Sequence, residues 1–323
     1  MDFARLLGGG LLLYLGAEWF VAGASALALA LRVPQVLIGL TIVAYGTSAP
    51  EVVVGIEAAA EGHGAVALAN VIGSNIANIG LILGVCALIK PARVDSSLRR
   101  RELPVLLASA ALVPLVLLDG VLVRWEALGL LGLALLYSTW MIRTARGARI
   151  VTAVRRDAAA EGAAADAAGA PTTKGAWRAT VTAFVGLLTL LVGGSLFVDG
   201  AVALAGALGV SERLIGLTVV ALGTSLPELS TSIIAARRGH SDLAVGNVIG
   251  SNIFNILLCL GGAAMFGAIH LDDPQMFFDL GALLLMTGLA AVFIRSERAI
   301  TRLEGGTVLV LYLIFIAVTI VRG

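Results

Sequence analysis

Two blocks of this sequence occur twice, 177 residues apart, and they constrain the fold more than any other feature. Residues 37–51 read LIGLTIVAYGTSAPE and residues 214–228 read LIGLTVVALGTSLPE, with 12 of 15 positions identical. At the same offset, NVIGSNIAN at 70–78 matches NVIGSNIFN at 247–255 at eight of nine positions. Two matches in one register indicate that the chain is a duplicated unit.

The composition places both copies in a membrane. Of the 323 residues, 59% are apolar and only 13% are charged, and the mean hydropathy is +0.99. Because a soluble domain is about 25% charged, a cytosolic enzyme, a nucleic-acid-binding protein and a disordered scaffold are excluded. We expect an all-α multi-pass membrane protein of ten transmembrane helices. The ten apolar runs of spanning length are 6–30, 35–60, 65–89, 103–118, 125–142, 179–208, 213–236, 243–269, 276–294 and 305–321.

The charges predict how these spans are oriented. Lys and Arg concentrate in cytoplasmic loops, and 18 of the 22 fall on the cytoplasmic side if the N-terminus lies outside. Each copy has five spans, an odd number, so the second copy must enter the membrane from the opposite side. We therefore expect two inverted-topology repeats, 1–143 and 179–323, with both termini outside and a flexible cytoplasmic linker at 144–178. Inverted repeats are typical of secondary transporters.

Each GTS-x-PE block predicts a break in the middle of an apolar span. Pro50 and Pro227 have no N–H and cannot bond the carbonyl four residues earlier. Carbonyl oxygens around 44–47 and 221–224 are therefore expected to lack helical partners. Such backbone is tolerated at membrane depth only where it lines a polar cavity or a ligand site.

A carboxylate follows each break, and a second polar pair lies in the next span. Burying Glu51 or Glu228 near the bilayer centre costs at least about 2.5–3.5 kcal/mol unless it is compensated. Two equivalent carboxylates with neighbouring carbonyl and hydroxyl oxygens suit a hard cation such as Ca²⁺. No His or Cys lies in the motif, which argues against zinc or copper. The next spans add residues four positions apart, on one helix face: Ser74 with Asn78, and Ser251 with Asn255.

Together these blocks resemble the alpha-1 and alpha-2 repeats of the calcium/cation antiporter superfamily, and especially prokaryotic sodium/calcium exchangers. The alpha-1 motif covers 37–78 and the alpha-2 motif covers 214–255. The resemblance extends over the whole ten-span layout. It implies a secondary active antiporter, not an enzyme, that exchanges Ca²⁺ for Na⁺ by alternating access, with spans one and six moving over the site.

The resemblance also implies individual roles. The Ca²⁺ ligands would be the carboxylates of Glu51 and Glu228 and the carbonyls of Thr47 and Thr224. The Na⁺ ligands would be Glu51, Glu228, Ser48, Ser74, Ser225, Ser251 and the carbonyls of Ala44 and Ala221. Asn78 and Asn255 would complete a central polar cluster. No cofactor and no nucleic-acid partner are expected; Ca²⁺ and Na⁺ are the transported ions, and the lipid bilayer is the other partner.

Several points remain open at this level. Potassium-dependent relatives carry Asp at the position of Asn255, so Asn favours a K⁺-independent exchanger. A site charge near −2 is neutralised by one Ca²⁺ or by two Na⁺, so the stoichiometry does not follow, nor does the oligomeric state. Glu18, Glu57 and Asp199 lie outside the repeated blocks, and each is either a carboxylate on an access path or a polar contact between helices. Arg outnumbers Lys 20 to 2, which is typical of a GC-rich genome and favours a prokaryotic plasma (inner) membrane.

Other functions fit the residues less well. The main alternative is an antiporter that couples Ca²⁺, or another divalent cation such as Mg²⁺ or Mn²⁺, to H⁺. A channel is less compatible with an inverted repeat around a carboxylate pair. An intramembrane enzyme would need a base beside the Thr-Ser pair, and the motif has no His or Lys.

Overall fold

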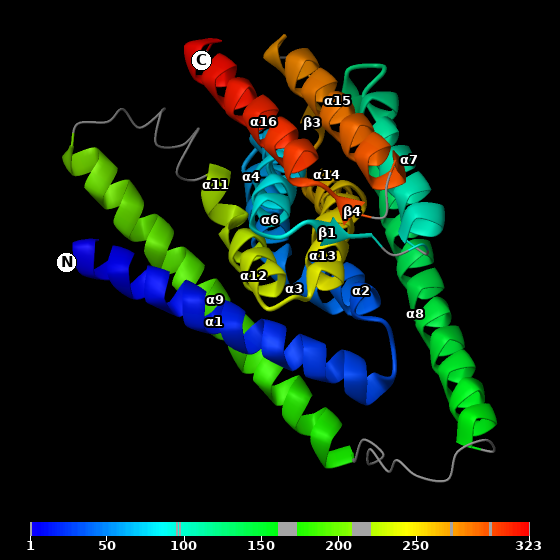
Figure 1. The fold of residues 1–323 in the computed structure, drawn as a ribbon. Coiled ribbons are helices and arrows are strands. Elements are labelled where there is room, and N and C mark those ends of the chain that lie inside the picture. Colours follow the sequence, from blue (N-terminus) through cyan, green and yellow to red (C-terminus); the bar gives the residue numbers. More distant parts are fainter. Residues whose placement is uncertain are drawn as a thin grey trace.

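The computed structural model describes residues 2–94, 96, 98–160, 173–208, 221–271, 274–296 and 299–322. Within these ranges the chain is helical apart from turns and two ladders of two residues per strand (Figure 1). The fold is thus all-helical in architecture, as the composition predicts.

Every predicted span is largely helical over the residues that the structure describes. The first repeat contains α1 (Asp2–Leu31), the broken span α2 (Gln35–Ile38), η1 (Gly39–Val43), α3 (Ala44–Thr47) and α4 (Ala49–Ala60), the span α5 (Gly64–Ala77), η2 (Asn78–Leu83) and α6 (Gly84–Ile89), then η3 (Leu98–Glu102) with α7 (Leu103–Val116), and α8 (Arg124–Ala160). The second contains α9 (Thr173–Ala207), α11 (Ala221–Thr224) with α12 (Leu226–Arg237), the span α13 (Ser241–Phe254), η5 (Asn255–Leu260) and α14 (Gly261–Phe266), then α15 (Gln275–Ser296) and α16 (Arg302–Arg322). The η segments are π-helical.

Length and hydropathy support membrane crossing for most of these helices. Among the described residues, seven are long and apolar enough to cross a membrane, and the bent pair Gln35–Thr47 and Ala49–Ala60 makes eight. The other two predicted spans are α7, which has 14 residues and follows η3, and α11–α12, whose predicted start at 213–220 lies outside the described residues.

The two short ladders display the inverted repeat directly. Strand β1 (Ala92–Arg93) pairs antiparallel with β4 (Ala299–Ile300), and β2 (Val121–Leu122) pairs antiparallel with β3 (Ile269–His270). Each ladder joins one strand from each half. The offset of 177 carries β1 onto β3, and carries β2 to within one residue of β4. Because β1 precedes α7 and β2 follows it, the ladders lie at opposite ends of that helix.

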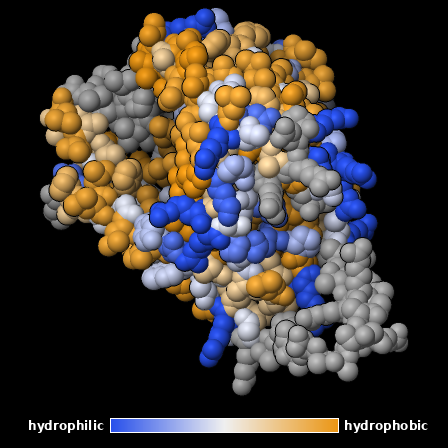
Figure 2. Space-filling view, viewed as in Figure 1, coloured by the Kyte–Doolittle hydropathy of each residue, from blue (hydrophilic) through white to orange (hydrophobic). Residues whose placement is uncertain are grey.

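The spans that carry the NVIGSN blocks form the centre of the protein. In an apolar stretch of 18 residues within Ser241–Phe266, 94% of the residues are buried, and in the corresponding stretch of Gly64–Ile89 the share is 72%. In Arg302–Arg322 it is only 17%. Figure 2 shows hydrophobic residues over much of one face, with hydrophilic ones gathered over the region of α12, β1 and β4. The exposed apolar faces of the outer helices are suited to lipid, and the polar motifs are enclosed.

Helices α1 and α9 pack as a pair through glycines. A Cβ placed on Gly16 would lie 2.4 Å from the backbone nitrogen of Leu190, and one on Gly193 would lie 2.5 Å from that of Leu13. The two backbones are therefore in direct contact, as small residues allow in membranes, and Figure 1 shows the helices lying side by side at the edge of the molecule. The glycines that make this contact recur every seven residues and again at the offset of 177: Gly9, Gly16, Gly23, Gly186, Gly193 and Gly200.

The segment 144–178 differs from the flexible linker that we expect from its composition. Helix α8 continues to Ala160 and α9 begins at Thr173, while residues 161–172 lie outside the described part. Ala and Arg are strong helix formers, and each extension continues a helix that already has a nucleus.

Candidate cation-binding site

The structure confirms a break in both GTS-x-PE spans. Ser48 separates α3 from α4 with φ −81° and ψ 5°, and the two arms of this span are bent by 42°. Ser225 separates α11 from α12 with φ −88° and ψ 4°. Pro50 and Pro227 lie in the first turn after each break, where a missing N–H leaves no helical bond unmade. The same local chemistry thus produces the same break in each half.

One expectation about the backbone at this break is wrong. The carbonyl of Ala44 is not free, because the N–H of Ser48 donates to it at 3.0 Å. In the second half, the N–H of Ser225 donates to the carbonyl of Leu222 at 3.2 Å. The bond to Ala44 spans four residues, as in an α-helix, whereas the bond to Leu222 spans three. The hydroxyl of Thr47 lies 3.5 Å from the Ala44 carbonyl oxygen but closer, at 3.0 Å, to that of Val43. Since a carbonyl oxygen has two lone pairs, that of Ala44 can still face a cation.

The two carboxylates lie at the junction of the two halves. Glu51 and Glu228 are both fully buried. The hydroxyl of Ser48 donates to Glu228 Oε1 at 3.0 Å, and the hydroxyl of Ser225 donates to Glu51 Oε1 at 3.2 Å. Each serine therefore serves the carboxylate of the other half. The Oε2 atoms of both carboxylates are buried and have no hydrogen-bond partner among the described residues.

Two asparagines brace the breaks from the opposite half. Thr47 Oγ1 lies 3.3 Å from Asn247 Oδ1, and Thr224 Oγ1 lies 3.5 Å from Asn70 Oδ1. The amide of Asn70 also donates to the carbonyl of Glu51 at 3.3 Å. Our sequence analysis gave these asparagines no role. Their signal was present, since each opens an NVIGSN block.

The predicted residues of the second motif are also buried, and Asn78 contacts the other half of the protein. The hydroxyls of Ser74 and Ser251 are buried without a partner in the described part of the chain. The amide of Asn78 donates to Asn252 Oδ1 at 3.0 Å, and the thiol of Cys259 lies 3.5 Å from Asn255 Oδ1. The predicted site residues that are at most 4% exposed are Ala44, Thr47, Ser48, Glu51, Ser74, Asn78, Ser225, Glu228, Ser251 and Asn255. Thr224 is half-buried, and Ala221 opens α11.

The spans that carry Asn78 and Asn255 change from α-helix to the wider π-helix at these residues. The π-helical segments η2 and η5 begin at Asn78 and Asn255, at equivalent places in the two repeats. Such segments are rare in proteins, and those that occur often lie at functional sites. In the second half, Gly250 allows a close approach, because a Cβ there would lie 2.8 Å from the carbonyl of Leu40. Sequence analysis placed these residues on helices but missed the change of helical pitch.

Other buried polar side chains were not predicted, among them Asn75 and Thr231. Asn75 is fully buried, and neither atom of its amide has a partner within the described ranges. Thr231 is buried one turn beyond Glu228, and its hydroxyl is likewise unpartnered there. Asn75 was visible as part of the repeated block. The residue equivalent to Thr231 in the first copy is Val54, so the repeat did not indicate a polar role for Thr231.

The chemistry of this cluster is that of a hard-cation site. It holds two buried carboxylates, hydroxyls and amide oxygens, several of them without hydrogen-bond partners in the described part of the chain. Two buried negative charges are costly unless cations compensate them. The described residues contain no group of three or more His, Cys, Asp or Glu that could hold a metal ion, so the donor set is unlike that of a transition-metal centre.

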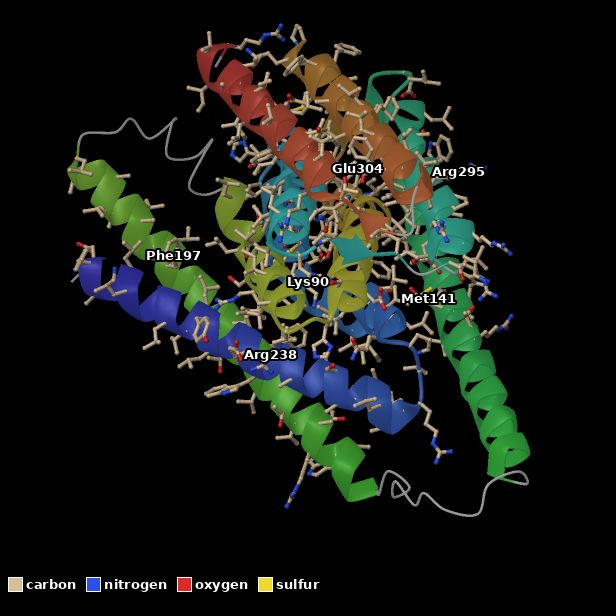
Figure 3. All side chains as sticks on the ribbon, in the orientation of Figure 1. Lys90, Met141, Phe197, Arg238, Arg295 and Glu304 are labelled. Carbon is tan, nitrogen blue, oxygen red and sulfur yellow. The ribbon has the colours of Figure 1, made fainter. Side chains whose placement is uncertain are left out.

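The carboxylates outside the repeated blocks have different surroundings. Glu18 forms an ion pair with Arg238, and Figure 3 shows Arg238 beside α1. For Glu18 the structure therefore favours a contact between helices. Glu57 on α4 and Asp199 on α9 are exposed.

Fold and site together define a class of protein: a secondary cation antiporter built from two inverted five-helix repeats around a buried carboxylate pair. Comparison with known proteins gives the family. The chain belongs to the sodium/calcium exchanger protein family, which matches residues 1–143 and 178–321. It is therefore a membrane transporter and not an enzyme.

Individual relatives cover almost the whole chain. The chain is 40% identical to the putative antiporter CaxA of Alkalimonas amylolytica over 95% of both proteins. It is 37% identical to the inner membrane protein YrbG of Escherichia coli K12, over 88% of this chain and 86% of that one. A solved structure of the sodium-calcium exchanger NCX_Mj, soaked with Na⁺ and Ca²⁺, matches with a TM-score of 0.83 at 33% identity, covering 98% of this chain and 97% of the other. These matches confirm the resemblance and the ten-helix inverted-repeat fold that the sequence predicted.

Proposed function

We propose that this protein exchanges Ca²⁺ for Na⁺ across the membrane by alternating access and does not need K⁺. The crossed hydrogen bonds Ser48–Glu228 and Ser225–Glu51 carry the proposal. They join the two inverted halves at a pair of buried carboxylates, and a site at the repeat interface is what alternating access requires.

The ligand assignment follows from the unpartnered oxygens. Ca²⁺ would bind between Glu51 and Glu228 through their free Oε2 atoms, with the carbonyls of Thr47 and Thr224 completing its coordination. Calcium accepts such mixed oxygen ligands. Since one set of carboxylates serves both ions, Ca²⁺ and Na⁺ would compete rather than bind together.

Na⁺ would occupy positions on either side of the carboxylates. The buried, unpartnered hydroxyls of Ser74 and Ser251 support this assignment. The other Na⁺ ligands that we propose are Ser48, Ser225 and the carbonyls of Ala44 and Ala221. Asn78 and Asn255 would order the centre of the site through their amides.

Independence from K⁺ is proposed from the neutral side chain at Asn255. Relatives that need K⁺ resemble this chain but have a carboxylate there. In this protein Asn255 lies beside the thiol of Cys259 and brings no charge. Two carboxylates give a site charge of −2, which a single Ca²⁺ neutralises.

The orientation and the location are also proposals. The distribution of Lys and Arg supports termini outside the cell. The relative named inner membrane protein YrbG supports a prokaryotic plasma membrane.

Coupling to H⁺ is the second candidate. Carboxylates inside membranes also serve as proton carriers, and Glu51 and Glu228 are both fully buried. The name of the relative CaxA specifies an antiporter but no coupling ion. The experiment must therefore separate Na⁺ from H⁺.

Radioactive Ca²⁺ uptake into proteoliposomes makes that separation. Vesicles loaded with Na⁺ are diluted into Na⁺-free buffer, with and without K⁺ and with and without a pH gradient. We expect uptake that requires the outward Na⁺ gradient, ignores K⁺ and disappears when monensin collapses the Na⁺ gradient. Uptake driven by the pH gradient alone would refute Na⁺ coupling.

A further inference from the structure

The α1–α9 pair is tied to the ion-binding helices at one end of the molecule. Glu18 of α1 forms an ion pair with Arg238, which follows α12 at the turn into α13 (Figure 3). The two side chains are 21% and 39% exposed, so water screens the pair only in part. This contact connects a helix of the pair to the helix that carries Glu228.

A hydrogen-bonded triangle lies at the same turn. His240 Nε2 is 3.3 Å from the hydroxyl of Ser25 on α1, and His240 Nδ1 is 3.0 Å from Gln35 Oε1 at the start of α2. The amide of Gln35 donates to the hydroxyl of Ser25 at 2.8 Å. We call Glu18, Arg238, Ser25, Gln35 and His240 the clasp. By the charge count, its turns lie on the cytoplasmic side.

The equivalent positions of the other copy cannot form the same ion pair. The offset of 177 places Ser195 where the clasp has Glu18, and Glu61 where it has Arg238. A serine and a glutamate form no ion pair. Val202 stands in place of Ser25 and offers no hydrogen bond. The clasp therefore breaks the symmetry of an otherwise duplicated protein.

We propose that the clasp holds α1 and α9 in the arrangement seen here and so favours one of the two alternating states over the other. Glu18 and Arg238 are thus positioning residues for exchange, an inference that rests on the proposed function. If the two halves trade roles during transport, an ion pair that forms in only one state stabilises that state. A partly exposed pair shifts the ratio of the two states about two- to fivefold.

The glycine contacts between α1 and α9 extend the restraint on α1 to α9. Because the backbones of α1 and α9 touch at Gly16 and Gly193, holding α1 also holds α9. A tie on one helix therefore restrains both helices that cover the site.

Distances between spin labels test the proposal. Labels replace Leu29 near the end of α1 and Leu303 at the start of α16, which are 73% and 82% exposed, while the native cysteines are buried. Pulsed electron paramagnetic resonance in nanodiscs then measures the distances without any ion gradient. We expect a major and a minor distance in the wild-type background, with Glu18→Gln and Arg238→Gln each raising the minor fraction about two- to fivefold.

Charge-swapped variants separate positioning from general damage. Glu18→Arg combined with Arg238→Glu restores the ion pair and should return the distribution to the wild-type one. Ser195→Glu combined with Glu61→Arg builds a pair at the opposite end and should raise the minor fraction, as loss of the clasp does. Each of these double variants also tests the proposal if a single variant fails to fold.

The outcomes distinguish this inference from the proposed function. The proposal would be overturned if the wild type and both single variants gave the same distribution of label distances. It would also be overturned if the wild type and every variant gave only a single, identical distance. Absence of Na⁺-driven Ca²⁺ uptake by the wild type would overturn the proposed function instead.

Discussion

Removing one charge from the buried carboxylate pair should abolish Ca²⁺ exchange. Glu228→Gln keeps the size of the side chain and an oxygen that can accept the hydrogen bond from Ser48. It lowers the site charge from −2 to −1, so a bound Ca²⁺ would keep one uncompensated positive charge. The same holds for Glu51→Gln, because the halves are equivalent and both carboxylates are fully buried.

The expected magnitude follows from that burial. Leaving one member of a buried ion pair unpaired costs about 3–5 kcal/mol. At about 1.4 kcal/mol per factor of ten, Ca²⁺ affinity falls about 140- to 3,700-fold. In ion-free buffer each variant should unfold at the same or a higher temperature than the wild type, since a buried unpaired charge has been removed.

The assay is Ca²⁺ affinity by calorimetry on the purified protein, with Na⁺-driven uptake in proteoliposomes as the functional readout. Glu57→Gln is the matched control. It lies on the same helix as Glu51 but is exposed, and we expect its affinity to stay within twofold of wild type. A Glu228→Gln protein that binds Ca²⁺ within tenfold of wild type would refute the reasoning.

Three further changes test other parts of the structure. Gly186→Ala should lower stability by about 1–3 kcal/mol, measured as a lower Tm, because its Cβ would lie 2.3 Å from α1 backbone; Gly8→Ala, with nothing within 4 Å among the described residues, should not. Ser225→Ala should raise the Na⁺ concentration for half-maximal exchange about tenfold or more, since hydrogen bonds to charged groups contribute about 1.5–3 kcal/mol; Ser109→Ala, equally buried but outside the site, should leave it unchanged. Burial and neighbouring Arg238 lower the pKa of His240, so the unfolded chain binds this proton more readily and stability falls as pH drops below about 6.5; His240→Gln should show a smaller loss of Tm between pH 7 and pH 5.5, and an unchanged loss would contradict this pKa shift.

The breaks and the carboxylates could be predicted because their causes are local. A proline in the middle of a span interrupts the helix, as Pro50 and Pro227 do. A carboxylate inside a membrane costs free energy unless it is compensated, which applies to Glu51 and Glu228. The duplication then implied that these features meet. It could not show how they meet, because equivalence does not specify which serine serves which carboxylate.

Other features depend on distant parts of the chain or on small changes in geometry. Glu18 finds Arg238 only once α1 has packed beside the turn after α12, and no local pattern links the two. The π-helices at Asn78 and Asn255 differ from α-helix by one residue in the hydrogen-bonding step, which hydrophobic periodicity does not resolve. The carbonyl of Ala44 keeps its partner because the break starts after the amide of Ser48, whereas the bond that Pro50 cannot make is to the carbonyl of Gly46.

The glycine repeat of α1 and α9 was visible in the sequence but carried no chemistry by itself. Gly9, Gly16 and Gly23 recur in the second copy at the same offset. Only the structure shows that they face one another across two helices. The seven-residue spacing of these glycines is therefore explained by the packing of α1 against α9.

Competition between Na⁺ and Ca²⁺ at equilibrium tests the central claim most directly. Radioactive Ca²⁺ bound to the purified protein is titrated with Na⁺ at constant ionic strength, with choline as the control cation. One shared site at Glu51 and Glu228 predicts complete displacement of Ca²⁺ by Na⁺ with a Hill coefficient above one, and little displacement by choline or K⁺. Ca²⁺ binding that Na⁺ leaves unchanged would contradict a shared site, and with it the exchange mechanism.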